Sequence, residues 1–144
     1  WHRDQFGNGG AWGNWRYRYS NNNIVGAVSQ SGGAPTGAII ERGTNANGDY
    51  TKFADGTMIC TRAYFGPLSL APASVNTIAL PFSGTFITAP LVLTGVSSSY
   101  PYDITGGVET SVGVNSCSVS IKNRNATITV SNIYIQLCAI GRWF

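Results

Sequence analysis

The sequence contains few charged residues. Only 10 % of its 144 residues are Asp, Glu, Lys or Arg, whereas typical soluble domains contain about 25 %. The nine basic residues are scattered and the formal net charge is +3, so the sequence does not indicate nucleic-acid binding. No stretch approaches the ~20 consecutive apolar residues of a membrane-spanning helix. We therefore expect no nucleic-acid partner and no membrane insertion.

Side chains for catalysis are equally scarce. The only histidine is His2, far along the chain from any cysteine, whereas an activated Ser or Cys needs a base beside it. Among six carboxylates, only Asp103 and Glu109 share one loop region and could form the pair that glycoside hydrolysis requires. The same two could contribute to a calcium site, but no ligand-spaced motif accompanies them. We predict no enzyme, no metal and no cofactor.

The three cysteines, an odd number, do not suggest a disulfide framework. Cys60, Cys117 and Cys138 all lie in apolar runs, where a free thiol behaves as a small hydrophobic side chain. We expect buried reduced thiols, and a bridge between Cys117 and Cys138 stays open if their strands pair.

No window has a sustained helical period, and 18 glycines and six prolines interrupt the chain too often for helices of ordinary length. Alternation of period two between turn residues predicts strands instead. Residues 50–54 and 57–61 flank Asp55-Gly56, a strong hairpin signal. Further strands are expected at residues 75–82, 91–96, 108–114, 117–122, 126–130 and 133–140. Both faces of residues 133–140 are largely apolar, which predicts a core strand that is buried on both sides or packed against another chain.

The first 47 residues mix glycine with large aromatic side chains and contain too little aliphatic material for a core of their own. Their aromatic side chains could form an exposed carbohydrate platform, but burial between chains is favoured because large exposed patches are rare. We expect an intertwined neck. The aromatic set is Trp1, Trp12, Trp15, Tyr17 and Tyr19. Because the chain begins with Trp1 rather than Met, we expect a piece from the C-terminal part of a longer protein.

Two stretches carry a resemblance to known families. Residues 37–60, GAIIERGTNANGDYTKFADGTMIC, with Ser29-Gln-Ser-Gly-Gly33 upstream, resemble a segment near the C-terminus of phage and prophage tail-fibre proteins. The chain from Val75 onward resembles an H-type lectin domain, on the pieces IALPF (78–82), APLVL (89–93) and QLCAIG (136–141). Together the two resemblances cover about two-thirds of the chain.

The H-type lectin resemblance implies a six-stranded antiparallel β-sandwich that forms a parallel homotrimer. These lectins bind sugars, notably N-acetylgalactosamine, in loops near the subunit boundaries. The sequence departs from that pattern where Leu137 replaces a frequent tryptophan of the last strand, and where Lys122-Asn123-Arg124-Asn125 carries neither the aromatic nor the histidine that some of these lectins use. The resemblance therefore does not carry over a sugar specificity.

Two loops are candidate glycan-binding sites, because functional residues favour loops on a rigid scaffold. In residues 97–107, Tyr100 and Tyr102 could stack on a sugar and Asp103 could accept hydrogen bonds from its hydroxyls; the alternative is an ordinary turn packed on the sandwich edge. In the second loop Asn123, Arg124 and Asn125 could recognise hydroxyls or phosphates; the alternative is a tight turn with a solvated arginine.

The sequence thus predicts an all-β protein: an irregular trimeric neck over residues 1–47, followed by an H-type lectin-like antiparallel β-sandwich of about six strands over residues 48–144. The expected function is that of the receptor-binding tip of a phage or bacteriocin tail fibre. The virion component, assembled in the host cytoplasm and acting outside the cell, would attach to a bacterial surface polysaccharide or lipopolysaccharide and join the rest of the fibre on its N-terminal side. The alternatives are a purely structural trimerisation or capping module and, less favoured, a polysaccharide depolymerase.

Overall fold

The computed structural model describes residues 19–100 and 103–144. All regular structure in these residues is β-strand, as the alternation of period two predicts. The strands are β1 (Gln30–Ser31), β2 (Ala34–Pro35), β3 (Ile40–Asn45), β4 (Gly48–Phe53), β5 (Thr57–Leu70), β6 (Val75–Pro81), β7 (Leu91–Ser97), β8 (Ile104–Val112), β9 (Ser116–Asn123) and β10 (Val130–Arg142). Within these described residues there is no helix long and apolar enough to cross a membrane.

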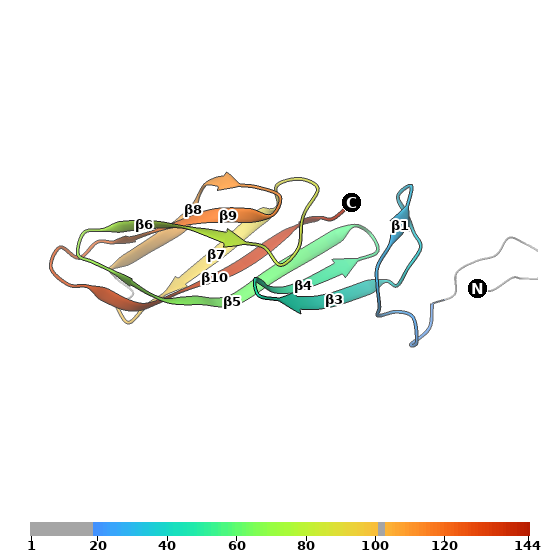
Figure 1. The fold of residues 1–144 in the computed structure, drawn as a ribbon, viewed down its shortest axis with the longest axis horizontal. Helices are drawn as coiled ribbons and strands as arrows, with labels where there is room; N and C mark the ends of the chain where they lie inside the picture. Colours follow the sequence, from blue (N-terminus) through green and yellow to red (C-terminus); the bar gives the residue numbers. More distant parts are fainter. Residues whose placement is uncertain (1–18, 101–102) are drawn as a thin grey trace, which may run out of the picture.

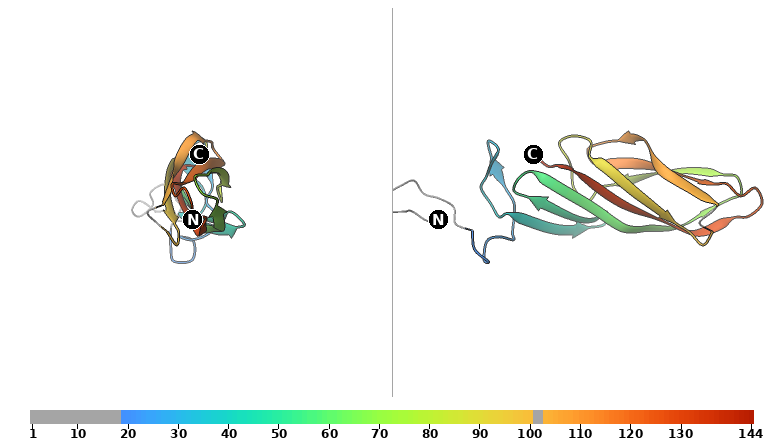
Figure 2. Two further views of the ribbon diagram at one scale, coloured as in Figure 1. Left: turned by 90° about the vertical axis from the view of Figure 1, so that its left-hand side faces the viewer. Right: turned by 180° about the vertical axis from the view of Figure 1, so that it is seen from behind.

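Two antiparallel sheets pack face to face (Figure 1). The larger has the strand order β3-β4-β5-β10-β7 and the smaller the order β6-β9-β8. Strands β5 to β10 make up the two facing layers, and β3 and β4 continue the larger sheet beyond them (Figures 1 and 2). The predicted antiparallel β-sandwich is confirmed.

The last strand closes the core, as its sequence predicts. Strand β10 lies between β5 and β7 and pairs with both. Its inward side chains Ile133, Ile135, Leu137 and Ala139 are buried, and they meet Cys117, Val119 and Ile121 of β9 in one hydrophobic cluster. The inner faces of two packed sheets form a dry core about 10 Å thick. Burial of the inward side chains of β9 and β10 in this core stabilises the sandwich.

Most predicted strands are confirmed, including the hairpin at Asp55-Gly56, where Asp55 Oδ1 accepts a hydrogen bond from the Thr57 amide at 2.8 Å. The expected strand at residues 126–130 is wrong: these residues form a loop up to Val130, the first residue of β10. The alternation there is misleading because the side chain of Asn125 accepts the Thr127 and Ile128 amides and holds the chain in a turn.

Two strands extend further than the sequence predicts. Strand β5 continues past Thr61 to Leu70, through Gly66-Pro67. Proline lacks the amide that a sheet ladder needs, and it is tolerated here because the β5–β10 register shifts in this region. Strand β8 begins at Ile104 and includes Gly106, where a Cβ would lie only 2.8 Å from Val96 Cγ2; the glycine permits close packing of β8 on β7.

Residues 19–39 run along one end of the sandwich with little regular structure. A two-residue pairing of β1 with β2 projects from this segment. The segment is attached to β3 by backbone hydrogen bonds, such as Gly26 N to Ile40 O at 2.9 Å, and by the Val28 amide, which donates to Glu41 Oε2 at 2.9 Å. Trp1, Trp12, Trp15 and Tyr17 of the aromatic set lie outside the described residues.

All three cysteines are free thiols. Cys60 and Cys117 are buried, as expected, and burial raises the pKa of both thiols. Cys138 differs, because it is half-buried on the outward face of β10. The strands of Cys117 and Cys138 belong to different sheets, so the pairing that a bridge between them would require is not present.

Candidate functional site

Three loops meet at the end of the sandwich remote from residues 19–39 (Figure 1). We call them the far-end loops: residues 71–74 between β5 and β6, the described residues 98–100 and 103 between β7 and β8, and residues 124–129 between β9 and β10. Backbone hydrogen bonds join them directly. The Ala73 amide donates to Asn125 O at 2.8 Å, and the Arg124 amide donates to Asp103 O at 2.7 Å. Loops anchored to a packed sandwich in this way hold their outward side chains in fixed relative positions.

Asn123 is the centre of this arrangement. Its side chain is 0 % exposed, and Nδ2 lies within hydrogen-bond distance of the carbonyl oxygens of Leu70, Ala71 and Ile128 at 3.2, 3.0 and 2.8 Å. Its Oδ1 accepts the Asn125 amide at 2.9 Å. A buried amide with all its polar atoms occupied satisfies backbone groups that would otherwise lack partners. Asn123 therefore ties two far-end loops together and offers no surface to a ligand in this structure.

Asn125 has a similar supporting role on the second loop. Its Nδ2 donates to Asp103 Oδ2 at 3.1 Å, and its Oδ1 accepts the Thr127 and Ile128 amides, each at 2.9 Å. The side chain is half-buried. The structure thus brings the two predicted loops into contact through Asn125 and Asp103.

Tyr100 and Arg124 are the outward members of the predicted set. Tyr100 is 50 % exposed and Arg124 is also exposed, while Asp103 is half-buried. Tyr102 lies outside the described residues. An exposed aromatic ring, a guanidinium and a carboxylate on one end of the molecule provide a stacking face with donors and acceptors for hydroxyl groups.

Two of the described carboxylates, Glu41 and Asp55, have structural roles. Glu41 accepts hydrogen bonds from Tyr50 and Lys52 as well as from Val28. Burial raises the pKa of this carboxyl, but these hydrogen bonds and the Lys52 charge lower it by more, so its pKa lies below the ordinary value. The hydrogen bond from the Thr57 amide likewise lowers the pKa of Asp55.

The side chain of Asp103 accepts a hydrogen bond from Asn125. The side chain of Glu109, with which Asp103 was predicted to form a pair, lies outside the described part of the chain. No group of three or more His, Cys, Asp or Glu among residues 19–100 and 103–144 is arranged to hold a metal ion.

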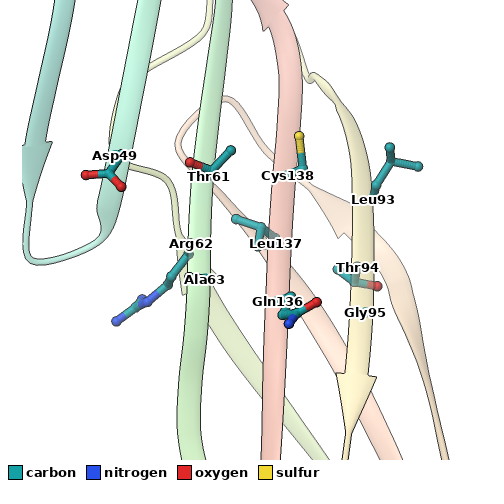
Figure 3. Close-up of a pocket in the computed structure, with 10 residues that line it drawn as sticks. All are labelled: Asp49, Thr61, Arg62, Ala63, Leu93, Thr94, Gly95, Gln136, Leu137 and Cys138. Carbon is teal, nitrogen blue, oxygen red and sulfur yellow. The ribbon is translucent and has the colours of Figure 1, made fainter.

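A second surface of interest is the outward face of the larger sheet (Figure 3). An open hollow of about 480 Å³ crosses β4, β5, β10 and β7 there. It is lined by Asp49, Thr61, Arg62, Ala63, Leu93, Thr94, Gly95, Gln136, Leu137 and Cys138. The Arg62 guanidinium lies over the Phe65 ring at 4.7 Å from its centroid and is therefore held along β5.

Strand register gathers apolar side chains on this outward face. Ile140 pairs with Ile59 on one side and with Leu91 on the other, and Cys138 pairs with Leu93. Paired residues of neighbouring strands share a face. Leu91 and Leu93 are 65 % and 56 % exposed, and β7 is an edge strand of its sheet. We call Ile59, Leu91, Leu93, Cys138 and Ile140 the outer-face patch. The sequence signals its β10 part through the two apolar faces of residues 133–140, but not its continuation onto β5 and β7, which depends on register.

The fold is similar to that of two solved structures. One is an N-truncated R1-type pyocin tail fibre, with a TM-score of 0.54 and 20 % identity over 72 % of this chain and 88 % of that chain. The other is a C-terminal fragment of the R1 pyocin fibre of P. aeruginosa, with a TM-score of 0.54 and 17 % identity over 94 % of this chain and 40 % of that chain. No protein-family model and no curated protein matches the sequence. At these identities the likeness establishes a common fold.

Proposed function

We propose that this chain is the receptor-binding tip of a tail fibre, from a bacteriophage or a headless tail-like bacteriocin, and that it attaches the particle to a glycan of the bacterial surface. The observation that carries this proposal is the shared fold with two pyocin tail-fibre structures. The tail-fibre and H-type lectin resemblances of residues 37–60 and of the chain from Val75 onward support it independently of the coordinates.

The glycan-binding part of the proposal concerns the far-end loops. Residues 19–39 lead away from the opposite end of the sandwich (Figure 1), so a fibre that continues on the N-terminal side would leave the far-end loops facing outward. We propose that Tyr100, Tyr102, Asp103 and Arg124 contact a surface polysaccharide or lipopolysaccharide. Asn123 and Asn125 would support these contacts from within the loops, because their polar atoms are occupied by backbone groups and by Asp103.

We further propose a homotrimer, in which neighbouring copies cover the outer-face patch. Single exposed apolar residues are ordinary, but adjacent leucines on an edge strand beside a half-buried cysteine and isoleucine favour association with another chain. Residues 1–47 would supply the intertwined neck and residues 48–144 the tip, with β3 (Ile40–Asn45) of the neck range joined to the larger sheet of the tip. Three identical sites on one trimer would raise a weak sugar affinity through avidity.

A purely structural trimerisation or capping module is the alternative function. It predicts that the far-end loops are dispensable for attachment. A depolymerase is not favoured, because Glu41 and Asp55 are committed to hydrogen bonds inside the domain, and a glycosidase needs two carboxylates that face one bond.

Binding of the fluorescently labelled chain to a panel of Gram-negative bacteria and to their purified lipopolysaccharides tests the proposal. The double variant Tyr100→Ala, Arg124→Ala should lose at least about tenfold in apparent affinity for the strains that the parent binds. Asn76→Ala, at an exposed position on β6, is the matched control and should bind as the parent does. No binding by the parent to any strain would overturn the receptor-binding proposal in favour of a capping module. Equal binding by the parent and the double variant would overturn the far-end loops as the binding site.

A further inference from the structure

A pocket of about 420 Å³ lies at the end of the sandwich opposite to the far-end loops. Tyr50 and Lys52 of β4 form one side of it, Ser83 to Thr85 of the segment between β6 and β7 form another, and Trp143, just after β10, closes it. Its volume falls within the range of about 300–1,000 Å³ that is typical of small-molecule sites. We call it the Tyr50–Trp143 pocket.

The two aromatic side chains of this pocket are held in place. The Tyr50 ring lies over Gly43 of β3, where any Cβ would overlap it, and the Tyr50 hydroxyl donates to Glu41 Oε1 at 3.0 Å. The indole Nε1 of Trp143 donates to Phe53 O at 2.9 Å. Rings fixed by packing and by hydrogen bonds lose little conformational entropy when a ligand packs against them.

Lys52 lies between the rings. Its Nζ is 5.3 Å from the Tyr50 ring centroid and 5.5 Å from that of Trp143, and it forms an ion pair with Glu41 at 3.5 Å. An ammonium group has three N–H donors, so two are left without an acceptor among the described residues. Because Glu41 balances the lysine charge, the site suits a neutral ligand that accepts hydrogen bonds.

The polar side of the pocket is equally well supported. Asn45 Nδ2 donates to Ser83 O at 2.8 Å, and the Ser83 hydroxyl donates to Asp49 O, so the segment between β6 and β7 is fixed against the β3–β4 hairpin. Thr85 is exposed at the mouth of the pocket. Its hydroxyl and the Lys52 ammonium are therefore available to a ligand that rests against the aromatic rings.

We propose that the Tyr50–Trp143 pocket binds one neutral monosaccharide unit of a bacterial surface glycan. The sugar rests beside Lys52 against the two aromatic rings, and its hydroxyls accept hydrogen bonds from Lys52 and Thr85. The class of ligand rests on the proposed function, whereas the position does not: the pocket is separate from the far-end loops and makes a second point of contact along the fibre.

Titration of the ¹⁵N-labelled full chain with a panel of neutral methyl glycosides (glucoside, galactoside, mannoside, rhamnoside and the two common N-acetylhexosaminides) tests this proposal. At least one of them should shift the indole N–H resonance of Trp143 saturably. Thr85→Trp, which fills the mouth of the pocket from an exposed position, should weaken that binding about tenfold or more. Thr88→Trp, exposed on the same segment but outside the pocket, should leave it unchanged. Lys52→Met should also weaken it, since it keeps the aliphatic stem and removes the donors.

Absence of a saturable shift with every glycoside, or shifts that persist in Thr85→Trp, would overturn the proposal. Failure of the proposed function has a different signature. In that case the parent would bind no strain, while the glycoside shifts at Trp143 and their loss in Thr85→Trp would still be observed. Loss of bacterial binding in the far-end variant, together with no glycoside shift at Trp143, would overturn only the proposed sugar site in the pocket and would leave the proposed function in place.

Discussion

Asn125 Nδ2 and Asp103 Oδ2 lie 3.1 Å apart, and this hydrogen bond connects the loop after β9 to the loop after β7. The Arg124 amide reinforces the connection by donating to Asp103 O at 2.7 Å. Tyr100 and Arg124 are thus carried by loops that are attached to each other as well as to the sandwich. The far-end loops form one structural unit, so a substitution that disturbs one loop should also alter the conformation of the others.

Asn125→Ala should destabilise that unit. The substitution removes the donor to Asp103 and leaves the amides of Thr127 and Ile128 without their acceptor. Loss of such partners in a half-buried turn costs about 1–3 kcal/mol, so urea unfolding should show a lower free energy of unfolding by that amount. Thr129→Ala, exposed on the same loop, should change it by less than about 0.5 kcal/mol. Equal stability of the two variants would contradict the structural role of Asn125.

Asn123 should be more sensitive than Asn125, because it is completely buried. Asn123→Ala leaves the carbonyls of Leu70, Ala71 and Ile128 without their common donor and should cost roughly 2–4 kcal/mol, the sum of lost hydrogen bonds and a small cavity. Asn123→Asp should cost still more at neutral pH, since a buried carboxylate would face carbonyl oxygens, and it should recover part of the loss when acid protonates it. Thermal unfolding at neutral and acid pH, with Lys122→Ala as an exposed control, measures both effects.

The core could be predicted from sequence because it depends on local alternation. Residues 117–122 and 133–140 each carry one fully apolar face, and those faces are the ones buried in the structure. The far-end site could be predicted only in part. Polar residues in a loop were visible, but whether Asn123 points outward or inward depends on carbonyls more than 50 positions away in the chain, at Leu70 and Ala71. The alternation of apolar and polar residues along a strand does not indicate partners so distant in the chain.

The Tyr50–Trp143 pocket could also be predicted only in part from the sequence. Tyr50 and Lys52 are two residues apart on a strand, so period two already predicts that they share a face. Nothing local indicates that Trp143 closes the pocket from the other end of the chain, because the strand order β4-β5-β10 brings it there. A second signal in the sequence is Gly43, which allows the Tyr50 ring to lie on the neighbouring strand.

The outer-face patch predicts how the chain associates. Leu91→Glu should dissociate the proposed trimer, because a charge would then be buried between copies. Val75→Glu is the matched control, since Val75 is 60 % exposed on the smaller sheet and Leu91 is 65 % exposed on the larger. Sedimentation velocity should report a trimer for the parent and the control and a monomer for Leu91→Glu. Cys138, which belongs to the patch, should react with a thiol reagent faster in Leu91→Glu than in the parent. If the parent sediments as a monomer, the proposed trimer interface is contradicted.

Stability at acid pH should depend on Glu41. Its folded-state pKa lies below the ordinary value of 4.5, because hydrogen bonds from Val28 and Tyr50 and the charge of Lys52 outweigh the opposing effect of burial. A lowered carboxyl pKa stabilises the folded state above the ordinary value, and that contribution is lost as the pH falls through the folded-state pKa. Glu41→Gln should therefore unfold at lower urea concentration than the parent near pH ~7, and the two midpoints should converge by pH ~3. Asp55, whose pKa is lowered by the Thr57 amide, should keep some acid dependence in the variant. Parallel curves for the parent and Glu41→Gln over this range would show that the Glu41 network contributes no pH-dependent stability.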